Sequence, residues 1–281
     1  MDKPGSWRKA DKERLPQAEA FLKEREQYCV AACSRYLRRG GRDHLWYLPD
    51  REGRIRNLLF HSRRSLFPIL LDSEMIPPPP FMGRFLRSYP IHLIQGLSAD
   101  VRIFEHFMDC EAYKPSDAFD YYLMKLDVPP AAETLLKGPP GISFRIPEPG
   151  DTDGLFPLQE AYEKEEVLPR GAIFNPVSSR LSLEHIIRNE RSLIAELDGR
   201  IVGKINTNAR SFSRCQIGGV YVLPPYRGRG IGTCMTARFA DMLIKEGWGL
   251  SLFVKQRNTA ASALYRRLGF SLAGDYRIVY Y

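Results

Sequence analysis

A basic, glycine-rich segment between a strand and a helix constrains the fold of this chain most. Residues 215–223 have the apolar pattern of a strand, and apolar side chains that recur at a period near 3.6 residues predict a helix over 231–245. The segment between them, 226–233, reads YRGRGIGT. At a helix start, free backbone N–H groups and the positive end of the helix dipole face outward, and glycines let an anion approach the backbone. The segment therefore predicts an anion-binding site.

The spacing of these glycines excludes two common phosphate-binding motifs. The segment contains no G-x-x-x-x-G-K-[ST] sequence, and the glycines at 228, 230 and 232 do not form G-x-G-x-x-G in either register. The sequence therefore favours neither a nucleoside triphosphate nor a dinucleotide as the bound anion.

Glycine and proline cluster at 138–141, between an apolar run and the strand-like segment 142–146. Because 281 residues exceed one typical domain of about 100–200 residues, we expect two domains, 1–138 and 139–281. Helical and strand patterns alternate in both halves. This alternation predicts an α/β (α+β) fold with a mixed, mostly antiparallel, splayed sheet flanked by helices.

The N-terminal half shows the same order of patterns with weaker signals. Its apolar stripe predicts one long helix over 17–39, followed by a strand hairpin over 45–48 and 55–60. Because tandem prolines cannot supply ladder donors, the proline run 77–80 is expected to be a loop. A strand near Ile91 and a helix over 99–108 complete the pattern.

The net charge of +8 is compatible with any polyanionic partner, a phosphorylated co-substrate or nucleic acid included. The arginine-rich stretch 35–64 contains interleaved aromatic residues, which a nucleic-acid surface would also have. Strand alternation already explains those aromatic residues as core side chains, so we do not expect nucleic-acid binding.

The five cysteines are scattered and odd in number, which predicts reduced thiols and a cytoplasmic location. Cys29 and Cys33 are four residues apart, but no second Cys or His pair completes a tetrahedral site, so we expect no metal. No apolar run approaches the roughly 20 residues that span a bilayer, and residues 1–14 lack the apolar stretch of a signal peptide. We therefore expect no membrane association.

Three segments resemble the GNAT superfamily of acyl-CoA N-acyltransferases. Arg227-x-x-Gly230-x-Gly232 matches the R/Q-x-x-G-x-G/A loop that grips the pyrophosphate of coenzyme A in that superfamily. Residues 219–224, GVYVLP, look like its fourth strand, and residues 258–270, NTAASALYRRLGF, are similar to its N-x-x-A-x-x-L-Y-x-x-x-G-F segment. The resemblance covers about 142–281. Only the order of elements suggests that 17–128 is a degenerate GNAT-like copy of the same fold.

This resemblance implies a bound acyl-CoA. Backbone N–H groups over 229–233 would hold its pyrophosphate, with charge from Arg227 and Arg229, and main-chain groups of Val220 and Val222 would face the pantetheine arm. The amide of Val220 or of its neighbour would polarise the thioester carbonyl, and the glycine pair 218–219 would permit a bulge that parts this strand from the next. The predicted cofactor-binding residues are Val220, Val222, Arg227, Gly228, Arg229, Gly230, Ile231, Gly232, Thr233 and Asn258.

Tyr265 matches the position of the superfamily's frequent general acid. A phenol with a pKa of about 10 is protonated at neutral pH and can donate a proton to the departing thiolate. The competing interpretation is packing, since Tyr265 shares an apolar helix face with Leu264 and Leu268. Asn258 is both a good N-cap for this helix and the family position that contacts coenzyme A.

The sequence does not identify the general base. Four glutamates, at 160, 163, 165 and 166, crowd the helix predicted over 151–167, and for any single one of them a solvated acidic face is the stronger interpretation. Some superfamily members have a glutamate on the fourth strand. This chain has Gln216 nearby instead, which favours a proton relay through water.

Together these observations predict an enzyme, an N-acetyltransferase that transfers an acetyl group from acetyl-CoA to a primary amine of a small molecule or protein. The alternative is a catalytically silent acyl-CoA-binding sensor or interaction module, and a nucleic-acid binder is the third interpretation. We expect no acyl-CoA in the N-terminal half, because its presumed loop, 95–98, has one glycine and no arginine. The acceptor amine, the general base and the oligomeric state stay open.

Overall fold

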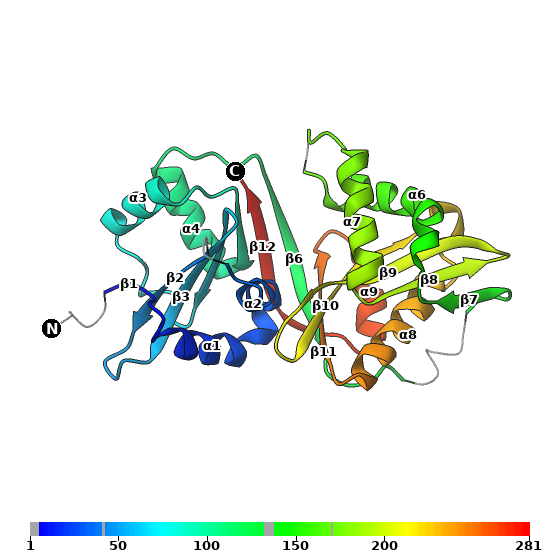
Figure 1. Ribbon diagram of the computed structural model, residues 1–281, viewed down its shortest axis with the longest axis horizontal. Helices are drawn as coiled ribbons and strands as arrows, with labels where there is room; N and C mark the ends of the chain where they lie inside the picture. Colours follow the sequence, from blue (N-terminus) through cyan, green and yellow to red (C-terminus); the bar gives the residue numbers. More distant parts are fainter. Residues whose placement is uncertain (1–5, 41–42, 132–137, 170) are drawn as a thin grey trace. The chain divides into compact units, whose positions relative to one another are not determined.

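A computed structural model describes residues 6–40, 43–131, 138–169 and 171–281 of the chain (Figure 1). Their contacts divide the chain into two units, one formed by 1–123 together with 273–281 and the other by 124–272. Strands β6 (Asp117–Leu126) and β12 (Ser271–Tyr280) each run from one unit into the other. The proposed boundary after residue 138 lies inside the second unit as these contacts define it.

The first unit is a sheet covered by helices. Its strands follow the order β1-β2-β3-β4-β5-β12, in which β2, β3 and β4 form an antiparallel meander and β5 runs parallel to β4. Its other elements are β1 (Arg8–Lys9), α1 (Leu15–Glu24), a 3₁₀ turn (Glu26–Tyr28), α2 (Val30–Leu37), β2 (His44–Pro49), β3 (Ile55–Ser62), β4 (Ser65–Leu70), α3 (Pro79–Ser88), β5 (Leu93–Leu97) and α4 (Ser98–Cys110).

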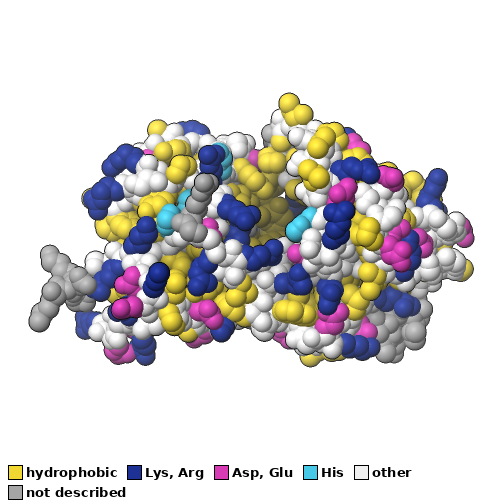
Figure 2. Space-filling model, viewed as in Figure 1, with side chains coloured by type: hydrophobic (Ala, Val, Ile, Leu, Met, Phe, Trp, Pro, Cys, Tyr) yellow, Lys and Arg dark blue, Asp and Glu magenta, His cyan; other side chains and the backbone are white. Residues whose placement is uncertain are grey.

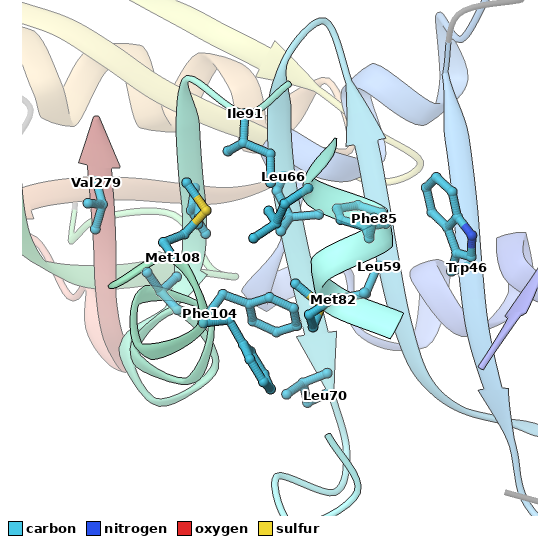
Figure 3. Close-up of a cluster of buried hydrophobic side chains, with 14 residues drawn as sticks. Trp46, Leu59, Leu66, Leu70, Met82, Phe85, Ile91, Phe104, Met108 and Val279 are labelled. Carbon is cyan, nitrogen blue, oxygen red and sulfur yellow. The ribbon is translucent and has the colours of Figure 1, made fainter. Parts of the chain in front are cut away.

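Apolar side chains from the sheet and from two helices form the core of this unit. Figure 3 shows Leu59 of β3, Leu66 of β4, Phe85 of α3 and Phe104 of α4 pointing toward one another, and Val279 of β12 belongs to the same cluster. All five are at most 3% exposed. Since an apolar side chain contributes about 1.5–3 kcal/mol when fully buried, this cluster explains why α3 and α4 pack on the sheet.

Two predictions for this unit are wrong in detail. The helix predicted over 17–39 is interrupted, because α1 ends at Glu24 and the backbone of Cys29 is not helical. Residues 23–27, KEREQ, leave a gap in the apolar stripe, and the helix breaks at this gap. The loop predicted over 77–80 is half helix, since α3 begins at Pro79, and proline is tolerated in a first helical turn.

The second unit has the same order of elements. Strands β7, β8, β9 and β10 are antiparallel neighbours, and β11 pairs in parallel with β10. The elements are β7 (Ile142–Arg145), a 3₁₀ turn (Pro149–Asp151), α6 (Thr152–Tyr162), a π-helical turn (Glu163–Val167), α7 (Pro176–Asn189), β8 (Ser192–Leu197), β9 (Arg200–Arg210), β10 (Arg214–Val222), a 3₁₀ turn (Pro224–Tyr226), α8 (Ile231–Lys245), β11 (Gly249–Lys255) and α9 (Thr259–Arg267).

Helices α6 and α8 cover opposite faces of this sheet. Successive residues of a strand face opposite sides, and on β9 a Cβ at Gly203 would lie 3.4 Å from Met235 of α8, whereas Lys204 lies beside Tyr162 of α6. The predicted α/β (α+β) fold, with a mixed and mostly antiparallel sheet flanked by helices, is confirmed.

Candidate active site

The glycine-rich segment ends β10 and begins α8, as the sequence predicts. Gly228 and Gly230 both have positive φ, +77° and +80°, and Gly230 is the N-cap of α8. A side chain drawn at Gly228 would meet nothing within 4 Å, so this part of the loop faces open space. The backbone N–H groups of Ile231, Gly232 and Thr233 are therefore the free first-turn donors of α8. Such a turn suits an anion.

The two predicted arginines of this segment have different surroundings. Arg227 donates two hydrogen bonds to the carboxylate of Glu165, at 3.0 and 2.9 Å, and a third to Val222 O at 2.9 Å. These hydrogen bonds from Arg227 lower the pKa of Glu165. Arg229 is exposed, with its guanidinium 5.5 Å from the ring centroid of Tyr226. Arg227 thus connects the loop to β10 and to the π-helical turn, whereas the side chain of Arg229 is exposed to solvent.

A bulge parts β10 from β11, and this prediction is confirmed. On the β9 side, Gly218 pairs with Asn206 and Tyr221 with Lys204, so one residue more stands on β10 than on β9. On the other side, the parallel pairing with β11 runs only as far as Ile217. Beyond it, the last five residues of β10, with Val220 and Val222 among them, are unpaired with β11, and their main chain is open on that side.

Glycine is required at Gly219 and leaves room for a neighbouring side chain at Gly218. A Cβ at Gly218 would lie 1.8 Å from the exposed side chain of Asn208, which would have to move, and one at Gly219 would lie 2.0 Å from Asn206 Oδ1. Gly219 also has φ +61°, which disfavours any side chain. The bulge therefore depends most on Gly219.

Tyr265 and Asn258 belong to α9. The side chain of Asn258 accepts a hydrogen bond of 3.0 Å from Ala261 N, which confirms it as the N-cap. Tyr265 is 7% exposed, and its ring packs edge-on against Phe270 at 5.7 Å. Burial raises the pKa of Tyr265, with smaller contributions from Tyr162 and Glu166, so the phenol holds its proton. Among the described residues its hydroxyl has no hydrogen-bond partner, which leaves that proton available.

Sequence comparison matches residues 158–270 to the acetyltransferase (GNAT) family, and this range contains the loop, the bulge and α9. These residues form a GNAT acetyltransferase domain. The family's general activity is acyl transfer, and its members generally use acetyl-CoA. A search of the curated proteins found no match to the sequence.

Solved structures extend the GNAT fold to nearly the whole chain. A Drosophila protein superposes with a TM-score of 0.66 at 13% identity, covering 98% of both chains. A GCN5-related N-acetyltransferase from Sphaerobacter thermophilus gives 0.62 at 18% identity, over 97% of this chain and 94% of that one. A tandem GNAT protein from the clavulanic acid biosynthesis pathway gives 0.56 at 14% identity, over 97% and 98%. The chain therefore has the fold of two GNAT domains in tandem.

The acidic segment of the GNAT domain is built into its structure. The carboxylate partners are Lys164 for Glu160 at 2.6 Å, Gln159 for Glu163 at 2.7 Å, Arg227 for Glu165 and Lys255 for Glu166 at 3.2 Å. The last three glutamates lie on a π-helical turn, a rare geometry that is frequent at functional sites. Gln216 is buried in β10, and its Oε1 has no hydrogen-bond partner among the residues that the structure describes. No described carboxylate of this segment is therefore an unengaged base.

Two residues beside the bulge were not singled out as site residues in the sequence. Tyr162 Oη accepts a hydrogen bond of 3.3 Å from Gly219 N, and Lys204 Nζ donates one of 3.1 Å to Gly219 O. Tyr162 lies within the helix predicted over 151–167. The sequence feature that could have identified Lys204 is its position within the largely apolar segment 200–206, RIVGKIN, because a lysine is rarely buried.

The N-terminal unit has a different loop at the corresponding place. Element order pairs the connection from β10 to α8 with the connection from β4 to α3, residues 71–78. This connection has the sequence LDSEMIPP, without glycine or arginine, and α3 opens on Pro79 and Pro80, which lack N–H donors. The predicted counterpart at 95–98 is wrong, since those residues belong to β5 and to the start of α4.

The described residues were also compared with the features of metal sites and of membrane-spanning helices. Within them, no three His, Cys, Asp or Glu side chains gather as metal ligands, and no helix is long and apolar enough to cross a bilayer. The five cysteines all lie among the described residues, and none of them is in a disulfide. On the face shown in Figure 2, Lys and Arg side chains are spread over both units among Asp and Glu.

Proposed function

We propose that this chain is an acyl-CoA N-acyltransferase that transfers an acetyl group from acetyl-CoA to a primary amine of a small molecule or a protein. The observation that carries the proposal is the end of pairing between β10 and β11 beside an open, glycine-rich helix start. The unpaired end of β10 provides main-chain groups for a pantetheine arm, and the start of α8 provides N–H donors for a pyrophosphate.

Each chemical requirement of the transfer has a residue in this proposal. The N–H groups over 229–233 and the charge of Arg229 hold the phosphates, while Asn258 lies at the start of α9 in the family's coenzyme A position. Gly219 N–H is already bound to Tyr162, so the N–H of Val220 is the donor for the thioester oxygen. The amine nitrogen bonds to the carbonyl carbon, the C–S bond breaks, and Tyr265 protonates the thiolate.

Proton removal from the amine passes through water in this proposal, because the described glutamates of the acidic segment are engaged. The same observation favours the second candidate, a silent acyl-CoA sensor, which would bind the co-substrate without turnover.

We retain the division into 1–138 and 139–281 as the proposed domains, with the active site in the second. Free cysteines support a reducing, cytoplasmic location.

Binding of acetyl-CoA to the full chain, measured by isothermal titration, tests the proposal. Gly230→Asp places a carboxylate at the N-cap of α8, so we expect its affinity to fall at least about 100-fold. Gly247→Asp is the matched control, since Gly247 also has positive φ, follows the other end of α8 and has nothing within 4 Å of a Cβ. Any loss of affinity in the control measures the general effect of an aspartate at a positive φ, away from the loop.

Absence of binding by the wild-type chain would refute the proposal, and near-normal affinity of a folded Gly230→Asp variant would remove the phosphate role of the loop. Thiol release from acetyl-CoA across a panel of primary amines then separates enzyme from sensor. The enzyme releases free coenzyme A in the presence of an acceptor. A chain that binds acetyl-CoA and releases none with any amine is the sensor.

A further inference from the structure

Lys204 is a buried lysine without a carboxylate partner. It lies on β9 with 4% of its surface exposed, and no described carboxylate comes within ion-pair distance of its ammonium. Its Nζ donates to Gly219 O at 3.1 Å and to Asn206 Oδ1 at 3.5 Å, and lies 4.6 Å from the ring centroid of Tyr162. Burying a charged group is unfavourable unless it gains strong partners. The carbonyl of Gly219 is the main partner it gains.

That carbonyl shares a peptide with the N–H of Val220. The peptide unit is planar and trans, so its C=O and N–H point in opposite directions, and holding the oxygen fixes the direction of the N–H. At this position the strand ladder cannot do so, because the bulge leaves the two residues between Gly218 and Tyr221 facing a single residue of β9. The contact with Lys204 replaces the missing ladder hydrogen bond.

The contact also changes the strength of the N–H as a donor. Hydrogen bonds in a chain polarise one another, so a cationic donor on the carbonyl oxygen draws electron density from the amide nitrogen and makes its N–H more acidic. The preceding N–H, of Gly219, is held by Tyr162 Oη. The bulge is therefore fixed from both sides.

We propose that Lys204 is a positioning residue for acyl transfer, which aims the N–H of Val220 at the thioester oxygen and strengthens it as a donor by holding the carbonyl of Gly219. The inference rests on the proposed function, in which the Val220 N–H stabilises the oxyanion. It adds a residue of β9 that touches neither the acyl-CoA nor the amine.

Lys204→Met, which keeps the length of the side chain and removes its charge, tests the inference through a separation of kcat from binding. We expect kcat to fall about 10-fold to 100-fold, less than the roughly 100-fold to 1,000-fold loss for a removed oxyanion donor, because the Val220 N–H stays in place. The Kd for acetyl-CoA should change less than about 3-fold. Lys245→Met is the control, since Lys245 is exposed on α8 in an ion pair with Asp241. It should leave both constants unchanged.

A spectroscopic measurement reads the peptide without any turnover. Lys204 faces Tyr162 from α6, Asn206 from its own strand and Gly219 from β10, with the charge of Glu163 nearby. Burial lowers the pKa of Lys204 to about 7, whereas that of Tyr162 is raised to about 12. In ¹⁵N-valine-labelled protein, the Val220 amide should therefore shift with an inflection near pH 7. Lys204→Met should lack this inflection.

The outcomes distinguish this inference from the proposed function. Wild-type turnover together with an unchanged kcat in folded Lys204→Met overturns the inference alone, as does a Val220 amide that titrates identically in both proteins. A wild-type chain without turnover overturns the proposed function and, with it, the catalytic role of Lys204. A reduced kcat with intact acetyl-CoA binding and a lost inflection supports both.

Discussion

Replacing Lys204 should change how the stability of the protein depends on pH. Burial lowers the pKa of this lysine from 10.5 in the unfolded chain to about 7 in the folded one. Between these values the unfolded state binds more protons than the folded state, so the free energy of unfolding rises with pH across this window. Each unit of pKa shift corresponds to about 1.36 kcal/mol, so the lysine destabilises the fold by about 5 kcal/mol below pH 7.

Methionine at this position does not titrate, and it packs without a charge to desolvate. We therefore expect Lys204→Met to be more stable than the wild type at low pH, and its advantage to shrink by about 1.4 kcal/mol per pH unit above pH 7. Between about pH 7.5 and about pH 9.5, the difference between the two proteins should change by roughly 2–3 kcal/mol. The lost hydrogen bond to Gly219 O offsets about 1 kcal/mol of the advantage at every pH.

Urea unfolding at several pH values, followed by tryptophan fluorescence, to which Trp248 of the second unit contributes, measures this difference. Other groups titrate in the same window, but they are common to both proteins and cancel in the comparison. A difference that stays constant with pH would refute the argument, because it would mean that Lys204 keeps an ordinary pKa and that its ammonium reaches water. Lys245→Met, at an exposed position, should follow the wild-type curve.

Two further substitutions test the site. Tyr265→Phe should bind acetyl-CoA nearly as tightly as wild type and lose about 10²–10⁴-fold in kcat. Tyr113→Phe is the control, because Tyr113 is exposed. An unchanged kcat in Tyr265→Phe removes Tyr265 from the mechanism. Arg227→Lys should raise the Kd for acetyl-CoA about 3-fold to 10-fold, because lysine cannot hold Glu165 and Val222 O together. The melting temperature of this variant should barely change, since the side chains of Arg227 and Glu165 are each 44% exposed. An unaltered Kd would contradict this positioning role.

Local sequence was sufficient for the loop and its helix. Helix α8 begins and ends where the apolar period predicts, at Ile231 and Lys245. Gly230, the N-cap of α8, has a positive φ that glycine adopts readily, and Asn258 caps α9 as its residue type predicts. The glycine pair 218–219 also indicated the bulge. These features depend on neighbours in the chain, because caps, turns and amphipathic stripes are set within a few residues.

Local sequence was insufficient where two effects compete. Strand β4 contains Pro68, and α3 begins with tandem prolines. Because proline lacks an N–H donor and disfavours regular structure, a local sequence pattern predicts neither element. Both elements exist because their apolar side chains enter one buried cluster, a gain that outweighs the local preference.

The sequence by itself indicated the GNAT family of residues 158–270, the glycine-rich loop at the start of α8 and the place of Tyr265 on α9, because those properties reside in contiguous segments. Only the tertiary structure showed that Arg227 is bound to Glu165, 62 residues away, and that Lys204 and Tyr162 hold the two sides of Gly219. Such contacts join strands and helices that are distant in the chain. The physical reason is that the pKa and partners of a polar group depend on what surrounds it after folding, and no local pattern encodes those surroundings.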